Sequence, residues 1–344
     1  YVWDNGASEV LGYAPKIMAN SELTWETTKQ WNVGVDFGFF NNRLSGTVDL
    51  YLQHTSDLLL ERQIPVVSGF GSVLSNVGET KNKGIEISLS SLNINTKSFQ
   101  WTTDVMFYAN KESIESLYNG KVDDIGNKWF IGHPINVHYD YEKIGIWQNT
   151  PEDLAEMEEF NKNGANFKPG DIKIWDNGDK KITEADRKIL GSTSPKFIAS
   201  MVNSISYKGF DFSIFLYASV GAMLNNNIEY LNKPGRANSI VIDYWTPTNP
   251  TNAYPRPSVD NASPAYVKSL QYEKADFIRV KNITLGYTLP EKLLKKIRAR
   301  KIRVYLSANN PFVITGFSGI DPEGARGYTA PSASTWMGGV NLSF

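Results

Sequence analysis

Apolar and polar residues alternate one by one along much of this chain, and this period of two limits the possible folds more than any other feature. Between positions 44 and 53, Leu44, Val48 and Leu52 fall on one side of an extended strand, whereas Asp49 and Gln53 fall on the other. The same alternation recurs in the segments 85–90, 101–109, 210–220, 302–309 and 336–344. We therefore expect an all-β fold whose strands each have one apolar face and one polar face.

A helix that crosses a membrane needs about 20 consecutive apolar residues, and the sequence contains no such run. Its best apolar stretch, from Ile214 to Leu224, is shorter and is interrupted by Ser219 and Gly221. A tilted β-strand crosses with about ten residues, of which only the lipid-facing half must be apolar. The alternating segments have this length, so they are suited to cross a membrane as strands.

The connections between the alternating segments come in two lengths that follow each other in turn. The short connections lie at 41–42, 95–98, 208–209 and 290–300. The long connections lie at about 55–77, 111–196, 222–275 and 311–334. Transmembrane barrels have short periplasmic turns and long outer loops, whereas a soluble sandwich has no reason to sort its loops by end. We therefore predict a transmembrane antiparallel β-barrel in a Gram-negative outer membrane, with extracellular loops at the long connections.

The segment Tyr139 to Trp147 resembles a short strand, but counting it as a crossing would break this alternation, so we place it in an outer loop. About nine crossings remain, near 28–40, 43–53, 83–93, 99–110, 197–207, 209–221, 276–288, 301–309 and 335–344. Bacterial barrels have an even number of strands, so residues 1–344 are expected to be the C-terminal part of one barrel domain. The chain begins at Tyr1 and has no targeting signal, which supports the same expectation.

Two strands depart from simple alternation. The polar Asn203 falls on an otherwise apolar strand face. Further along, the apolar face changes between Val280 and Ile283, and a β-bulge near Lys281 and Asn282 would account for the change. We expect both strands to remain crossings.

Composition and motifs exclude several classes of function. The 35 Lys and Arg and 36 Asp and Glu residues give a formal net charge of -1 and form no basic stripe that would bind nucleic acid. There is no cysteine, which excludes thiolate nucleophiles and cysteine metal sites. The histidines, His54, His133 and His138, lack metalloprotease spacing, and no Gly-x-Ser-x-Gly or P-loop motif occurs. We expect no catalytic residues, no enzyme activity and no cofactor.

Several short motifs follow one another in a fixed order along nearly the whole chain. They include Leu23-Thr24-Trp25-Glu26, Asn82-Lys83-Gly84-Ile85-Glu86, Gly170-Asp171-Ile172-Lys173, Tyr244-Trp245, the run from Arg279 to Pro290, Asp321-Pro322-Glu323 and the terminal Phe344. Their order and spacing resemble those of the C-terminal barrel portion of SusC/RagA-type TonB-linked outer-membrane transporters of Bacteroidetes. The terminal Phe, with alternate apolar residues before it, is similar to the outer-membrane assembly signal.

This resemblance implies a function for the whole protein. It implies a barrel of about 22 strands, with the plug, the TonB contact and the N-terminal strands all upstream of this chain. It further implies active import of a nutrient, an oligosaccharide or a peptide, energised through TonB. Many members pair with a SusD-like lipoprotein that closes the outer mouth as a lid. The expected partners are therefore this lipoprotein, TonB, outer-membrane lipid and the imported solute.

Two other functions remain open from the sequence. A passive porin or a surface-binding barrel would lack the plug and the TonB contact, and these residues do not include either part. A soluble lectin-like β-sandwich would lack lipid-facing stripes and the sorting of loops by length.

The long connections are rich in tryptophan and tyrosine, whose flat rings with polar edges suit contacts to a sugar, a peptide or a docked lipoprotein. The candidate contact residues are Trp129, Trp147, Trp175, Trp245 and Tyr254. The alternative for each is that it packs one loop against another. An aromatic belt at the membrane interface is expected from Trp25, Trp31, Trp101 and Trp336. Candidates to line a solute path are the inward-facing Asp49, Glu86, Asp104 and Arg303.

The segment Asp176 to Asp186 resembles a calcium loop, because it places oxygen ligands at near-alternate positions. Compared with the pattern that relatives carry, it is one residue shorter between Asp176 and Asn177, and Lys180 replaces the glycine of the sharp turn. Both changes favour a polar loop that is closed by its own Asp and Asn side chains, so we expect no metal here.

Overall fold

The computed structural model describes residues 2–4, 8–10, 17–226, 241–257, 264–294, 299–323 and 332–344. The chain divides into two compact units. Unit 1 comprises Tyr1–Gly34, Asp49–Gly84 and Asn110–Ile135, and unit 2 comprises Val35–Val48, Ile85–Ala109 and Asn136–Phe344. Within the described ranges, no helix is long and apolar enough to cross a membrane.

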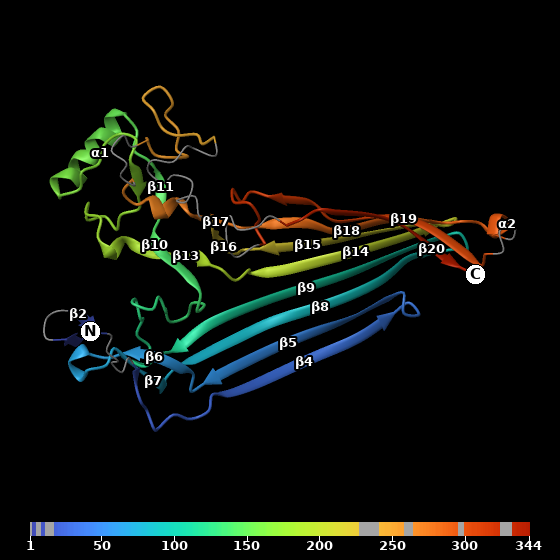
Figure 1. The fold of residues 1–344 in the computed structure, drawn as a ribbon, viewed down its shortest axis with the longest axis horizontal. Helices are drawn as coiled ribbons and strands as arrows, with labels where there is room; N and C mark the ends of the chain where they lie inside the picture. The colour runs from blue at the N-terminus through green and yellow to red at the C-terminus, as the bar shows by residue number, and fades with distance from the viewer. Residues whose placement is uncertain are drawn as a thin grey trace. The chain divides into compact units, whose positions relative to one another are not determined.

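Nine strands of the described chain form one sheet, in the order β20-β19-β18-β15-β14-β9-β8-β5-β4. They are β4 (Thr27–Phe39), β5 (Leu44–Ser56), β8 (Glu79–Asn95), β9 (Phe99–Ser116), β14 (Phe197–Tyr207), β15 (Phe210–Val220), β18 (Phe277–Thr288), β19 (Lys301–Thr315) and β20 (Thr335–Ser343). Every pairing from β9 to β20 is antiparallel. Figure 1 shows β14, β15 and β18, which lie wholly in unit 2, side by side. The predicted all-β fold and the predicted number of strands are confirmed.

Several strands are longer than the alternating segments that predict them. Strand β8 begins at Glu79 rather than at residue 83, β9 runs to Ser116 rather than to residue 110, and β19 runs to Thr315 rather than to residue 309. Backbone hydrogen bonds between strands do not require apolar side chains, so pairing continues beyond the apolar stripe. Alternation therefore predicts only the part of each strand that carries the stripe.

One face of the sheet in unit 2 is apolar from strand to strand. Leu285 of β18 pairs with Phe212 of β15 on one side and with Leu306 of β19 on the other. Leu306 is 54% exposed, and Val340 of β20 is 56% exposed, so the described residues leave this face uncovered. A continuous open apolar face is expected where lipid covers the sheet.

The two irregularities predicted from the sequence both have a structural basis. In the pairing of β18 with β15 the register shifts at Lys281, which is the extra residue of a β-bulge, so that prediction is confirmed. Asn203 lies on the apolar face, where its Oδ1 accepts hydrogen bonds from Trp101 Nε1 (2.9 Å) and Thr103 Oγ1 (2.7 Å). The polar side chain is therefore satisfied by neighbours on the same face.

The short connections are tight turns. Strands β14 and β15 are joined by Lys208 and Gly209, whose φ angles of 47° and 94° are those of the turn type that suits a two-residue hairpin. Asn41 and Asn42 in the β4–β5 connection also have positive φ angles, 56° and 60°. The β18–β19 connection contains the short helix α2 (Glu291–Leu294).

The long connections of unit 2 carry elements of their own. These are β10 (Val137–Tyr141), β11 (Lys143–Ile146), α1 (Pro151–Lys162), β12 (Ile172–Ile174), η2 (Glu184–Asp186), β13 (Arg187–Ser192), β16 (Met223–Asn225), η4 (Val267–Leu270) and β17 (Tyr272–Lys274). Strand β10 pairs with β13, β11 with β12 and β16 with β17, all outside the nine-stranded sheet. The segment 139–147 is therefore loop structure, as predicted.

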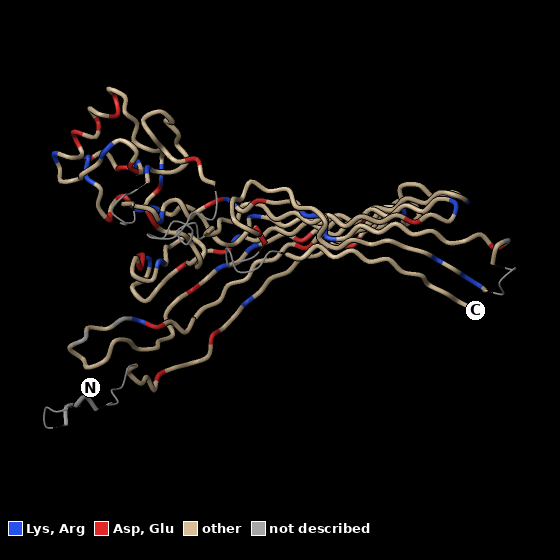
Figure 2. Tube along the Cα trace, turned by 45° about the horizontal axis from the view of Figure 1, so that its top comes forward, with Lys and Arg blue, Asp and Glu red and all other residues tan. Residues whose placement is uncertain are grey.

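Unit 2 sorts its connections by end. Figure 1 shows α1, β10, β11, β13, β16 and β17 at one end of β14, β15 and β18, and α2 at the other end. Figure 2 shows that charged residues gather in these loop elements, whereas the strands carry few of them toward the end with the short turns. The gathering of the long connections at one end and of the short connections at the other agrees with the two connection lengths in the sequence.

Unit 1 contains the ends of β4, β5, β8 and β9 and several short strands. These are β1 (Val2–Asp4), β2 (Ser8–Val10), β3 (Ile17–Met18), β6 (Leu59–Gln63) and β7 (Ser72–Asn76), with the short helix η1 (Val66–Ser68). Strand β7 lies between β3 and β6. The Nδ2 of Asn76 donates to the carbonyl oxygens of Thr24 and Asp57, both at 2.9 Å, and so ties this small sheet to the start of β4.

Candidate functional site

The face of the sheet opposite the apolar one is polar in unit 2. Arg303 of β19 donates through Nε to Asp211 of β15 at 2.9 Å, reaching across Gly286 of β18. A Cβ at Gly286 would lie 2.5 Å from Arg303 Nη2, so a side chain at this position would displace the ion pair. Ser90 of β8 donates to Asp104 of β9. The structure therefore places Arg303 and Asp104, two of the predicted path residues, on this polar face.

The other two predicted path residues lie on the same sheet but in different units. Glu86 of β8 is exposed in unit 2, and Asp49 of β5 is half-buried in unit 1. A polar face of this kind is what a water-filled barrel interior requires. It offers hydrogen-bonding groups to a passing solute.

A buried charged group ties the β19–β20 connection to the polar face of β18. Arg279 Nη2 donates to Asp321 Oδ1 at 2.5 Å, and Arg279 Nε lies 3.0 Å from Glu323 Oε2. Lys281, the bulge residue, forms an ion pair with the same Glu323. Arg279 and Asp321 are only 3% and 5% exposed.

The pKa of Asp321 reflects this surrounding. Burial alone would raise it, but the hydrogen bonds from Ser332 and from the Glu323 backbone, together with the charge of Arg279, lower the pKa below its ordinary value. Sequence reasoning missed this group. The sequence nevertheless contained a signal for it. Arg279 and Lys281 are two residues apart and positively charged, and Asp321 and Glu323 are two residues apart and negatively charged.

Two of the candidate contact residues lie inside the loop core of unit 2, which consists of two hydrophobic clusters, one with Trp147 and one with Trp245, that both pack against Ile182 and Tyr266. Trp147 is 1% exposed, and its ring packs against those of Phe160 (5.8 Å) and Phe167 (5.6 Å). Trp245 is 5% exposed and donates through Nε1 to Gln148 Oε1 at 2.8 Å. Apolar ring area is more stable buried than in water, and the loop assembly supplies the partners. In this structure Trp147 and Trp245 pack the loops, which is the alternative expected for each of them.

The residues of two sequence motifs contact one another around this core. Gly170 has a φ angle of 90°, and a Cβ there would lie 2.5 Å from the Trp245 ring. Asp171 Oδ1 accepts a hydrogen bond from Arg256 Nε at 3.0 Å. Lys173 Nζ lies 4.1 Å from the centre of the Trp147 ring. The Gly-Asp-Ile-Lys and Tyr-Trp motifs thus build the loop core.

The other three candidate contact residues are half-buried. Trp129 lies in unit 1, where its backbone N–H donates to Asp124 at 2.9 Å. Trp175 lies in unit 2 with Lys188 Nζ 4.2 Å above its ring. Tyr254 also lies in unit 2 and lines a cavity in the loops.

That loop cavity has a volume of about 360 Å³ and a mixed lining. Its walls include the charged Glu142, Lys143 and Glu273, the rings of Tyr254 and Tyr272, and the aliphatic Leu190, Met223 and Leu270. Lys143 Nζ donates to the carbonyl oxygens of Asn252 (2.7 Å) and Ala253 (2.9 Å), and burial lowers the pKa of this lysine. Charged groups beside aromatic rings suit a small polar solute.

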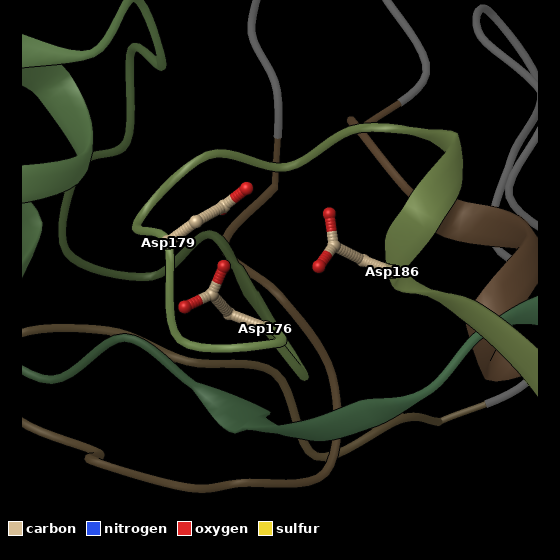
Figure 3. Close-up of side chains that lie close together, drawn as sticks. All are labelled: Asp176, Asp179 and Asp186. Atoms are coloured by element: carbon tan, nitrogen blue, oxygen red, sulfur yellow. The ribbon is translucent and has the colours of Figure 1, made fainter.

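The predicted polar loop brings three carboxylates together. Figure 3 shows Asp176, Asp179 and Asp186 pointing toward one another, with their nearest carboxylate oxygens within 4.8 Å of each other. Asp186 is fully buried and accepts hydrogen bonds from the backbone of Asn177 (3.0 Å) and Thr183 (2.7 Å).

The same loop is closed by its own side chains. Asp176 Oδ2 accepts from the backbone of Gly178 (3.0 Å) and Lys180 (3.2 Å), while Asp176 Oδ1 is buried without a hydrogen-bond partner in the described chain. Lys180 reaches the left-handed conformation of the glycine it replaces, with φ 57°, and its Nζ pairs with Glu156 at 2.9 Å. The expected obstacle to the sharp turn is therefore absent, and the carboxylates are the residues of this loop that could hold a cation.

The sequence matches the family described as TonB dependent receptor-like, β-barrel, over residues 3–310. The chain belongs to the TonB-dependent receptor β-barrel family. Among known relatives, TonB-dependent receptor P3 of Formosa agariphila is 35% identical over 335 residues, which are 92% of this chain and 32% of that protein. TonB-dependent receptor SusC of Bacteroides thetaiotaomicron is 32% identical over 342 residues, which are 94% of this chain and 32% of that protein.

Solved structures give the same result for this TonB-dependent receptor barrel. The RagAB peptide transporter superposes with a TM-score of 0.76 at 28% identity, covering 99% of this chain and 38% of that chain. The RagAB peptide importer in its open-open state gives 0.75. The chain thus spans about a third of the length of the relatives it matches.

These findings confirm the predicted resemblance to SusC and RagA. The family consists of outer-membrane receptors and transporters rather than enzymes, in agreement with the prediction that this chain is not an enzyme.

Proposed function

We propose that this TonB-dependent receptor barrel is part of an active importer that carries a nutrient, an oligosaccharide or a peptide, across the outer membrane. The family match over residues 3–310 carries the proposal. It is supported by a sheet that in unit 2 has one continuous apolar face and one polar face crossed by the Asp211–Arg303 pair. Lipid on one side and water on the other require this arrangement.

The whole importer would be a barrel of about 22 strands with a plug in its lumen. Strands β4 and β20 each have only one neighbour in the described sheet. Unpaired strand edges are unfavourable in lipid, since their N–H and C=O groups need partners. Further strands of the same protein would supply these partners, and an upstream plug would contact TonB.

The long connections would face the cell exterior and meet a SusD-like lipoprotein lid. Support comes from their own folded elements at one end of β14, β15 and β18 (Figure 1) and from half-buried rings such as Trp175 and Tyr254. RagAB is a peptide transporter, and SusC is a TonB-dependent receptor. By analogy, Trp129, Trp175 and Tyr254 are proposed to contact the solute or the lid.

Uptake by living cells tests the energy requirement. Cells that carry the gene should accumulate a labelled oligosaccharide or peptide, and either deletion of TonB or a protonophore should abolish the accumulation. A passive porin would instead allow equilibration that neither treatment changes. Such energy-independent flux would refute the proposal in favour of the porin.

Purification from the native membrane tests the partner. A surface lipoprotein should copurify in a fixed ratio, and the double variant W175A/Y254A should weaken its retention more than a matched change of exposed loop residues, E158A/E159A. If the purified barrel has open loops and carries no lipoprotein, the lid proposal is wrong.

A further inference from the structure

Two short turns lie next to each other at the end of unit 2 that is opposite the loop elements. The β8–β9 turn and the β14–β15 turn are joined by a hydrogen bond from Lys208 N to Ser98 O at 3.2 Å. Between them lies a cavity of about 440 Å³, here named the turn cavity, lined by residues 95–100, residues 206–211 and Thr288. The two turns therefore hold their side chains in a fixed mutual position.

The turn cavity carries positive charge. Lys97 and Lys208 both line it, and neither forms an ion pair within the described part of the chain. The one acidic residue in the lining, Asp211, is already paired with Arg303. Lys208 Nζ lies 5.1 Å from the centre of the Tyr207 ring, so its ammonium group is held at the cavity edge. An anion is the complementary ligand.

An aromatic row begins directly beside the two lysines on the apolar face. The register aligns Phe99, Tyr207, Phe210 and Tyr287 across β9, β14, β15 and β18. Two pairs of rings in this row contact each other, with centroids 6.1 Å apart for Phe99 and Tyr207 and 4.5 Å apart for Phe210 and Tyr287. Tyr207 is 45% exposed and Phe210 is 51% exposed. A cationic cavity thus adjoins an open apolar and aromatic surface.

We propose that the turn cavity binds the phosphate headgroup of a phospholipid in the inner leaflet of the outer membrane. Lys97 and Lys208 would pair with the phosphate, and the aromatic row would lie against the glycerol and upper acyl region. A free phosphate ion would use the lysines but would gain nothing from the rings. The proposal rests on the orientation in the proposed function, which puts the short turns on the periplasmic side.

Native mass spectrometry of the purified protein tests the site, with phosphatidylethanolamine as the probe. We expect the double variant K97Q/K208Q to bind the lipid about thirty-fold more weakly, because each lysine near a lipid surface contributes separately. The variant K97R/K208R should retain binding. The matched control K121Q/K168Q changes two exposed loop lysines that have no part in the cavity, and it should behave as wild type.

Two further measurements separate the possible sources of phosphate. Inorganic phosphate at the same concentration as the lipid should not displace the lipid. The variant Y207S/F210S, which keeps both lysines, should still bind the lipid more weakly than wild type. Equal displacement by inorganic phosphate, a preference for lipopolysaccharide over phospholipid, or unchanged binding by K97Q/K208Q would each overturn the proposal. If uptake does not depend on energy but lipid binding depends on the two lysines, then the proposed function is refuted and the lipid site at the turn cavity is supported.

Discussion

Asp321 attaches the β19–β20 connection to Arg279 of β18. The change D321N would leave the buried guanidinium of Arg279 with Glu323 as its remaining carboxylate. Breaking a buried ion pair costs about 3–5 kcal/mol when the partner charge is left alone, and the remaining carboxylate should reduce the cost to about 2 kcal/mol. Equilibrium unfolding by urea in lipid vesicles measures the loss.

The control for this change is E158Q, which removes an exposed ion pair with Lys162 on α1. Such pairs contribute little, so E158Q should unfold at the wild-type urea concentration. An equal loss in both variants would contradict the role assigned to Asp321.

The same carboxylate predicts a pH dependence. Its pKa in the folded protein lies below the ordinary value of 3.8, so the unfolded state binds the proton more readily. The contribution of Asp321 to stability is complete above pH 3.8 and is lost as the pH falls through the lower folded-state pKa. The difference in unfolding free energy between wild type and D321N should therefore shrink only in that acidic range.

The carboxylates of Asp176, Asp179 and Asp186 give a prediction about calcium. A loop closed by hydrogen bonds from its own backbone gains little from a cation, and Ca²⁺ usually takes 6–8 oxygen ligands. We therefore expect no change in Tm or in the amide protection of residues 176–186 when calcium is added or chelated. A Tm that rises with calcium concentration would show binding to the folded state and would make these three residues a metal site.

At the scale of single elements, β18 depends on its bulge. Lys281 is the extra residue that allows Ile278 and Leu285 to share the apolar face. Deleting Lys281 would move one half of the strand by one residue and turn its side chains to the opposite face. We expect the deletion to abolish assembly, read as loss of the heat-modifiable band on a gel, whereas K281A should assemble. Normal assembly of the deletion would refute this account.

The loop core gives a second prediction at this scale. W147A would remove a ring that is 1% exposed and leave a cavity beside Phe160 and Phe167, which costs about 3–5 kcal/mol. Hydrogen exchange should rise across α1 and β12, while the sheet stays protected. W175A, which changes a half-buried ring, should leave exchange near wild type. Equal exchange in the two variants would mean that Trp147 is not part of a core.

The sequence predicts an element well when the residues that determine it are close together in the chain, and poorly when they are far apart. Alternation predicts β5 or β15 because every other side chain must meet lipid, and a phase change at Lys281 predicts the bulge for the same reason. Burial of Trp147 and Trp245 depends on which loop segments meet, so their residue type alone cannot decide between core and contact. The row that contains Phe99 and Tyr287 depends on register between strands far apart in the sequence, which alternation does not give.

At the scale of the whole molecule, two opposite surfaces of one sheet must meet two different media. In unit 2 the apolar surface carries open residues such as Leu306 and Val340, and the polar surface carries Asp104 and Arg303. A membrane barrel is the arrangement in which both surfaces are solvated without a second protein layer. Whether lipid covers the apolar surface can therefore be decided by finding which tryptophans contact lipid.

Quenching by brominated lipid measures this property directly. The chain has 9 tryptophans, and Trp336 is 60% exposed on the apolar face, where it pairs with Ala308. In brominated phosphatidylcholine, W336F should lose part of the quenchable fluorescence, because bromine quenches only rings that it contacts. W147F should lose only unquenched emission, because that ring lies within the loop core. If W336F leaves the quenched intensity unchanged while W147F lowers it, then the apolar face is covered by protein, and the loops rather than the sheet meet the lipid.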